Sequence, residues 1–204
     1  SEKVFFMKVL LLVILLIFNL QSWAKADDVR DFEIEGMSVG DSLLNYFNEE
    51  TIKMGIQNDH IYNDDTFYDV EIYNLDLSYE FSNLSFNLKK NDKSYIIYQI
   101  TGFMFFENNI EECFKKVDEM AEIISEQLKD VKNIKRVDVE KPHDDDPTGN
   151  SKTKQTVFWH ESGSLFTECY DWSEKITKEK GWTDNFSVGV ALEEYDLWLN
   201  NKAY

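Results

Sequence analysis

The sequence predicts an α+β fold, in which one or more antiparallel sheets carry helices packed on one face. Three short strand-like segments precede each of two amphipathic helical segments. Within each group the strand-like segments follow one another too closely for the crossover connections that parallel strands need. The chain could therefore hold two strand-strand-strand-helix units, although no residue pattern repeats convincingly between them.

The strands are predicted from short apolar or alternating runs that are bounded by turn-forming residues. The first group comprises residues 67–73, 84–88 and 95–103, and the second comprises residues 155–160, 165–172 and 185–192. Residues 91–93 and 161–163 have the composition of hairpin turns. These turns favour antiparallel pairing of the strands that they connect.

The clearest helix is expected at residues 110–128, because apolar side chains recur there at helical spacing. Asn109 is placed to cap its first turn, with Glu112 reaching back three residues later. A second helix is expected at the end of the chain, with Tyr195 and Trp198 on its apolar side. A short third helix is predicted after Ser38, because Ser38 and Asp41 match a capping box.

Residues 131–154 form the most polar internal segment that lacks a sustained hydrophobic period. The segment also holds both prolines of the chain, Pro142 and Pro147. Because proline removes a backbone donor, it is unfavourable in the middle of a helix or a sheet. We therefore predict a long surface loop at 131–154, between the two halves of the domain.

The first 26 residues have the features of a cleavable secretory signal peptide. A basic start precedes an apolar run at 9–18, and small residues follow at 24–26. The apolar run is shorter than the roughly 20 residues that a membrane-spanning helix needs. Met7 has the features of a natural start, which would place residues 1–6 upstream of it. We therefore expect a soluble mature domain at 27–204, without an integral membrane span, in the periplasm or secreted.

The chain is strongly acidic. Its net charge of −18 becomes −20 in the mature domain, because residues 1–26 contain Lys3, Lys8 and Lys25 but only one acidic residue, Glu2. A charge of this size repels nucleic acid and anionic lipid, so neither is expected as a partner. It also favours a monomer. The remaining expectation is an unknown protein or small ligand, which a cationic group would suit.

Cys113 and Cys169 are the only cysteines in the chain. Both lie in the part expected to be exported, where the compartment is oxidising, so a disulfide between them is the simplest interpretation. The alternative is that Cys113 acts as a nucleophile. Glu111 and Glu112 argue against this alternative, because neighbouring negative charge raises the pKa of a thiol.

No catalytic residue is identified from the sequence. The run Gly40-Asp41-Ser42-Leu43 matches the short signature of GDSL-type esterases, but the segment before it is not an apolar strand and no histidine follows an aspartate at the spacing of that family. Carboxylates are too abundant in this chain for any pair to indicate a glycosidase. The protein is therefore expected not to be an enzyme, and a periplasmic hydrolase with an acidic cleft is the alternative.

A metal site is conceivable at Asp144, Asp146 and Thr148, which occupy the first, third and fifth positions of an EF-hand-like loop. The twelfth position is Gln155, whereas calcium loops of this type use a bidentate glutamate. A solvated acidic loop explains the same residues and is favoured. No motif for a cofactor is present, and none is expected.

A ligand could bind on one face of the segment 165–172. Alternation along this segment places Phe166, Tyr170 and Trp172 on one face of the sheet. Apolar groups also occupy the other face, which indicates a central strand. Packing in the core is the more common role of such aromatic residues.

Three segments resemble a group of small uncharacterised exported proteins from marine alphaproteobacteria: 31–44, 169–173 and the closing Trp198-Leu199 with Ala203-Tyr204. The resemblance covers the mature chain and implies export, with no known activity. The run Gly36-Met37-Ser38 is similar to the helix start of small envelope-assembly lipoproteins related to BamE. Together with the composition, these resemblances suggest a non-enzymatic binding or envelope-associated protein.

Overall fold

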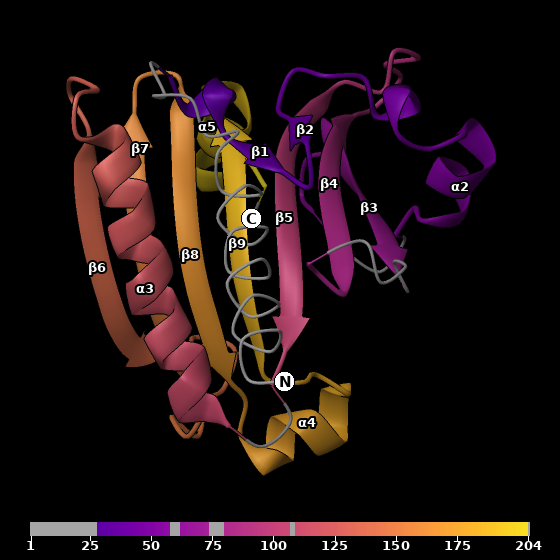
Figure 1. Ribbon diagram of the computed structural model, residues 1–204. Helices are drawn as coiled ribbons and strands as arrows, with labels where there is room; N and C mark the ends of the chain where they lie inside the picture. Colours follow the sequence, from indigo (N-terminus) through magenta and orange to yellow (C-terminus); the bar gives the residue numbers. More distant parts are fainter. Residues whose placement is uncertain (1–27, 58–61, 74–79, 107–108, 204) are drawn as a thin grey trace, which may run out of the picture.

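The computed structural model describes residues 28–57, 62–73, 80–106 and 109–203. Over these residues the chain forms a seven-stranded antiparallel sheet in the order β3-β4-β5-β9-β8-β7-β6, together with a small two-stranded sheet, β1-β2 (Figure 1). The strand bounds are β1 Glu33–Ile34, β2 Met37–Ser38, β3 Phe67–Tyr73, β4 Asn83–Lys89, β5 Ile97–Phe105, β6 Lys135–Pro142, β7 Lys152–His160, β8 Gly163–Asp171 and β9 Asn185–Leu192. The α+β class and the predicted strands are confirmed.

The helices that frame the sheet are α2 (Glu49–Met54), α3 (Ile110–Leu128), α4 (Glu174–Lys180) and α5 (Glu193–Asn201), and single 3-10 turns occur at η1 (Val29–Asp31) and η2 (Leu43–Asn45). Helix α3 has the predicted bounds. The side chain of Asn109 accepts a hydrogen bond from the backbone N–H of Glu112 at 3.3 Å, so the predicted N-cap is confirmed.

The two longest helices lie on opposite faces of the sheet, as alternation along β8 shows. Cys169 forms a disulfide with Cys113 of α3, whereas Ser164 donates a hydrogen bond to Asp196 of α5 at 3.1 Å. Because these two β8 residues are five positions apart, their side chains point to opposite faces. We call these faces the α3 face and the α5 face. Helices on a single face had been expected.

The opposite placement has a physical cause. Helix α3 lies across β7, β8 and β9 on its own face. At one end of the α5 face, Tyr195 and Trp198 of α5 form a separate buried apolar cluster with Phe67, Ala191 and Ala203. The two halves of the sheet therefore do not repeat one arrangement, since their helices pack on different faces and the second half contains the additional strand β6.

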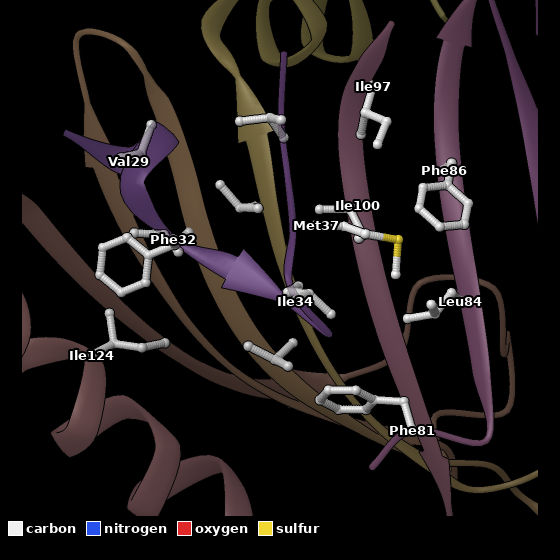
Figure 2. Close-up of a cluster of buried hydrophobic side chains, with 14 of the residues drawn as sticks. Val29, Phe32, Ile34, Met37, Phe81, Leu84, Phe86, Ile97, Ile100 and Ile124 are labelled. Atoms are coloured by element: carbon white, nitrogen blue, oxygen red, sulfur yellow. The ribbon is translucent and has the colours of Figure 1, made fainter. Parts of the chain in front are cut away.

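The main core lies on the α3 face and includes the N-terminal hairpin β1–β2. Figure 2 shows Ile34 and Met37 of this hairpin together with Ile100 of β5 and Leu84 of β4, all of which are buried. Helix α3 contributes a buried stripe at Cys113, Val117, Ala121, Ile124 and Leu128. The apolar period of the sequence therefore corresponds to the face of the helix that contacts the sheet.

The helix predicted after Ser38 was wrong. Glu35 and Gly36 have φ values of 54° and 74°, which is the geometry of a two-residue type I′ hairpin turn between β1 and β2. The following backbone pairs with the start of β5, where Gly40 N–H donates to the carbonyl of Ile97 at 2.8 Å. Only the 3-10 turn η2 remains helical. Long-range backbone pairing therefore outweighs the local capping pattern.

The prediction of a continuous surface loop at 131–154 was also wrong, because this segment contains β6 and the beginning of β7. Among the described strands, β6 lies at the edge of the sheet and pairs with β7 alone. Val137 and Val139 are half-buried, and the remaining positions of the strand are exposed. An edge strand with charged side chains and a terminal proline has a polar sequence, and such a sequence resists pairing with other chains.

The predicted signal peptide lies outside the described residues, as does His60. Within the described part of the chain, no helix has the length and hydropathy needed to cross a membrane.

Candidate functional site

Four aromatic rings meet at the end of the sheet that lies away from α5. They belong to His143, Tyr170, Trp172 and Trp182, and we call them the aromatic cluster. The ring centroids of His143 and Trp172 are 4.4 Å apart, and those of Trp172 and Trp182 are 4.6 Å apart. The Tyr170 ring lies 5.1 Å from His143 and 5.4 Å from Trp172. All four side chains are partly exposed.

Strand β8 places two of these rings. Residues at even positions of β8 point to the α5 face, which puts Tyr170 there, and Trp172 follows directly after the strand. The prediction that segment 165–172 is a central strand is confirmed, because β8 pairs with β9 on one side and β7 on the other. The predicted pair Tyr170 and Trp172 is therefore brought together by the strand and its C-terminal extension.

Helix α4 places Trp182. The side chain of Ser173 caps the helix by accepting from the N–H of Ile176, and Gly181 ends it in the left-handed conformation with φ of 72°. The N–H of Gly181 donates to the carbonyl of Thr177 at 3.0 Å. A glycine is favoured at such a C-cap because it has no Cβ to oppose a positive φ. The chain reverses there, and Trp182 comes to lie against Trp172.

The loop between β6 and β7 places His143, and a buried carboxylate organises this loop. Asp146 accepts from the N–H and hydroxyl of Thr148 at 2.9 and 2.6 Å, and from the N–H and hydroxyl of Ser151 at 3.0 and 2.7 Å. The hydroxyl of Ser173, the cap of α4, also donates to it at 2.8 Å. These donors hold the pKa of Asp146 well below its usual value. One carboxylate therefore ties the loop to α4.

The three residues predicted as metal-site candidates, Asp144, Asp146 and Thr148, make contacts within the β6–β7 loop and its neighbours. Thr148 donates its hydroxyl to Asp146, and Asp144 is exposed and forms an ion pair with Lys141. Throughout the described ranges, no group of three or more histidine, cysteine, aspartate or glutamate side chains is gathered as a metal site would require.

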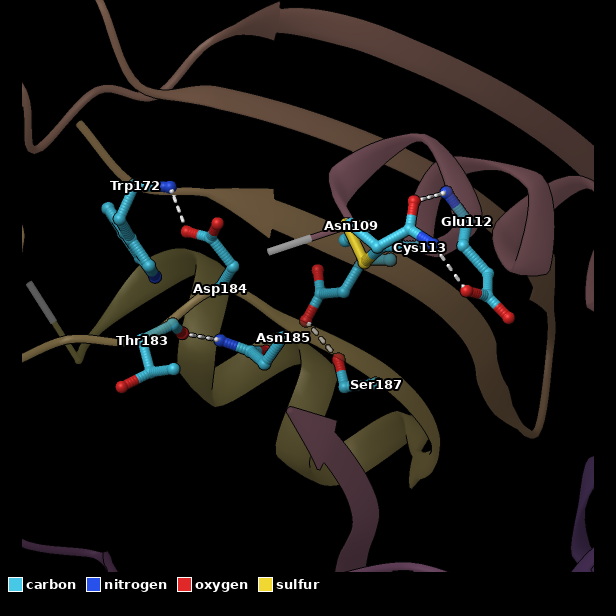
Figure 3. Close-up of a disulfide and its surroundings, with 10 residues drawn as sticks. Asn109, Glu112, Cys113, Trp172, Thr183, Asp184, Asn185 and Ser187 are labelled. Atoms are coloured by element: carbon cyan, nitrogen blue, oxygen red, sulfur yellow. Dashed lines mark hydrogen bonds between the residues drawn. A yellow bond between two sulfur atoms is a disulfide. The ribbon is translucent and has the colours of Figure 1, made fainter. Parts of the chain in front are cut away.

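Carboxylates surround the aromatic cluster. Figure 3 shows the Asp184 carboxylate beside Trp172, whose backbone N–H donates to it at 2.7 Å. Burial raises the pKa of Asp184, and burial also raises the pKa of Asp171, which precedes Trp172. Asp145 lies close enough to Tyr170 to contribute to the rise in the pKa of its hydroxyl. Raised pKa values of this kind mean that negative charge is poorly solvated at these positions.

His143 is held in one tautomer. Its Nδ1 accepts a hydrogen bond from the N–H of Asp145 at 3.1 Å, which leaves the proton of the neutral ring on Nε2. Burial lowers the pKa of His143, so the ring is neutral at pH 7. A neutral ring adds an aromatic face to the cluster without adding a positive charge.

Glu168 lies next to the cluster on the α5 face and is buried. Its carboxylate accepts from Ser187 Oγ at 3.0 Å and from Gln155 Nε2 at 2.8 Å, and the hydroxyl of Tyr170 also donates to it. Burial raises the pKa of Glu168. Burial and the charge of Glu168 raise the pKa of Tyr170 well above its usual value, so Tyr170 remains a hydrogen-bond donor.

The third predicted binding residue, Phe166, lies apart from the cluster. Its ring covers Gly189 of β9, where a Cβ would come within 2.3 Å of the ring. Phe166 therefore fills the space above a glycine in the sheet. The serine of the esterase-like motif, Ser42, donates its hydroxyl to the backbone carbonyl of Ser94 at 2.6 Å.

Sequence reasoning missed His143 and Trp182 as members of a site. A glycine at the end of a helix followed by a large apolar residue does indicate a packed C-cap at Gly181 and Trp182. Nothing local relates His143 to Trp172, because their contact depends on the fold of the β6–β7 loop. Comparison with protein-family models, curated proteins and solved structures gave no match to this chain.

Proposed function

We propose that this protein is an exported binding protein without catalytic activity, and that it takes a cationic ligand at the aromatic cluster. The observation that carries this proposal is the meeting of four partly exposed rings, with the Asp184 carboxylate held nearby by the backbone N–H of Trp172. Aromatic faces attract cations through their quadrupole, and the attraction grows when the site is partly desolvated. The carboxylates add the opposite charge.

The charge of the whole chain supports a cationic ligand. With 39 acidic and 21 basic residues, the protein attracts cations over long range and repels anions. Near the cluster, Lys141 is paired with Asp144, and Lys152 lowers the pKa of Asp171. Lys141 and Lys152 are thus engaged with carboxylates, while burial keeps the pKa of Asp184 raised.

Export is supported by the disulfide between Cys113 and Cys169, which joins α3 to β8 with a Cα–Cα distance of 6.0 Å. Disulfides persist in oxidising compartments and are rare in the cytosol. This bond agrees with the secretory signal that the first 26 residues predict, and it favours a periplasmic or extracellular location.

The proposal is tested by isothermal titration of the purified mature protein with tetramethylammonium chloride. We expect saturable binding, which weakens about five- to tenfold in Trp182→Leu because a partly desolvated cation–π contact is lost. Trp159→Leu is the matched control, since Trp159 lies on the same face but pairs with Ser164, at the opposite end of β8 from Tyr170. Absence of binding to the unaltered protein, or equal weakening in both variants, would refute the proposal.

Glu168 is the group on which a hydrolase with an acidic cleft would depend, because a buried carboxyl with a raised pKa can act as a general acid. Such chemistry needs a second carboxylate or a base at a defined distance. The described groups that hydrogen-bond to Glu168 are the side chains of Ser187, Gln155 and Tyr170, which are all neutral. These partners hold the Glu168 carboxylate within the sheet, which gives it a structural role.

A further inference from the structure

One ring of the aromatic cluster already carries an ammonium group. The Nζ of Lys180 lies over the Trp182 ring, 4.3 Å from its centroid. Lys180 is the last residue of α4 and is exposed, and Trp182 follows it by two positions. The contact therefore consists of a tethered cation on an aromatic face.

The backbone of α4 makes this contact local. Gly181, in the left-handed conformation, turns the chain back so that Trp182 approaches the end of the helix. Because Lys180 and Trp182 are joined through Gly181 alone, the Lys180 ammonium has a high effective concentration at the Trp182 ring. It therefore competes with any free cation for that ring. Lys178, two residues earlier on the same helix, instead forms an ion pair with Glu174 at 3.4 Å.

We propose that the aromatic cluster recognises a quaternary ammonium head group, and that Lys180 is a tethered competitor that the ligand must displace from Trp182. This inference rests on the proposed binding of cations at the same cluster. A quaternary ammonium is the cation for which aromatic faces are used most effectively in recognition. A free primary ammonium gains less binding free energy, because it must give up strong hydration. Lys180 also already supplies a primary ammonium at the Trp182 ring.

Lys180 would then set both the affinity of the aromatic cluster for its ligand and its selectivity among cations. While the lysine occupies Trp182, a weakly bound cation is excluded, and only a ligand that also contacts Trp172 or the nearby carboxylates gains enough to displace it. Trp172 and Trp182 have their centroids 4.6 Å apart, so a displaced Lys180 would leave a surface of two adjoining rings.

The test compares Lys180→Gln with Lys178→Gln by isothermal titration with tetramethylammonium chloride. Both variants remove one positive charge from α4, so long-range electrostatics change equally. Lys180→Gln is expected to bind about three- to sixfold more tightly than Lys178→Gln, which is the gain from removing an exposed cation–π competitor. Circular dichroism and thermal unfolding verify that both variants are folded.

Equal affinities in the two lysine variants, with binding that still weakens in Trp182→Leu, would overturn the role of Lys180 while leaving the proposed function intact. Absence of binding in the unaltered protein and in Lys180→Gln would overturn both. The same variants are also sedimented with phosphatidylcholine vesicles, with phosphatidylglycerol vesicles as the control, because the head group could be free or part of a lipid. Tighter binding by Lys180→Gln to either source supports the inference.

Discussion

Asp196 is a carboxyl group of α5 that is held between this helix and the sheet. One of its oxygens accepts a hydrogen bond from Ser164 Oγ at 3.1 Å, and its Oδ2 atom is buried with no hydrogen-bond partner among the described residues. Burial raises the pKa of Asp196 from 3.8 to about 6, and the nearby charge of Glu193 adds to this effect. Asp196 therefore keeps its proton to a higher pH in the folded protein than in the unfolded chain.

The sign of the resulting pH dependence follows from linkage. Because folding raises the pKa, the folded protein binds the proton more tightly than the unfolded chain, and the contribution to stability is complete below about pH 4 and is lost as the pH rises through about 6. We expect Asp196→Asn to remove this dependence and to increase the free energy of unfolding at pH 7 by at most about 3 kcal/mol. Urea unfolding of both proteins between pH 4 and pH 7 measures the free energy of unfolding and its pH dependence.

Glu50→Gln is a suitable control, because Glu50 is an exposed acid on α2 and the substitution changes the net charge equally. A pH profile of Asp196→Asn that parallels that of the unaltered protein would show that other groups dominate the pH dependence.

At the scale of elements, side chains distant in sequence join loops and helices to the sheet. Asp146 connects the β6–β7 loop to the start of α4, because Ser151 and Ser173 both donate to its Oδ2. The Ser151 hydroxyl in turn accepts from the N–H of Ser173 at 2.9 Å. These bonds fix the two segments that carry His143 and Trp182.

We expect Asp146→Ala to lower the thermal midpoint by several degrees, because several buried donors would lose their acceptor. It should also weaken binding of tetramethylammonium by disordering the positions of His143 and Trp182. Asp144→Ala serves as the comparison, since Asp144 is exposed and its ion pair with Lys141 contributes little. Similar midpoints for the two variants would contradict the role assigned to Asp146.

The disulfide is the covalent link between α3 and the sheet, and it joins residues separated by 56 positions. Loss of the bond in the double variant Cys113→Ala/Cys169→Ala should reduce the free energy of unfolding by about 4 kcal/mol, mainly because the unfolded chain gains conformational entropy. Denaturant unfolding with and without a reductant measures the loss. The reductant should destabilise only the unaltered protein, and an equal response of both proteins would contradict this prediction.

At the scale of the whole molecule, the sheet divides the protein into two sides with different chemistry. The α3 face contains most of the apolar core. The α5 face carries buried polar side chains, including Asp69, Asn87, Thr101, Glu168 and Ser187. Helix α5 lies at one end of the sheet and α4 at the other (Figure 1). The aromatic cluster belongs to the α4 end, because Tyr170 lies at the opposite end of β8 from Ser164, which contacts α5. The proposed binding of a cationic ligand rests on the acidic charge together with the aromatic cluster.

Much of this fold could be predicted because the relevant signals are local. Helix α3 was predicted with its bounds and its cap, since nineteen residues repeat one apolar period and Asn109 precedes them. The β1–β2 hairpin and β6 could not be predicted in the same way. Pairing with β5 decides the conformation after Ser38, and β6 is an edge strand whose charged residues give no strand-like apolar pattern.

Local signals in the sequence predict the strongly acidic charge, the antiparallel α+β class, the pairing of the two cysteines, and the placement of Tyr170 and Trp172 on one side of β8. Each of these follows from composition, from the count of cysteines or from side-chain alternation. Those signals do not predict that α3 and α5 cover opposite faces, or that His143 and Trp182 join Trp172. Those contacts depend on loops held by Asp146 and Gly181, and residues distant in sequence meet only once the sheet has formed.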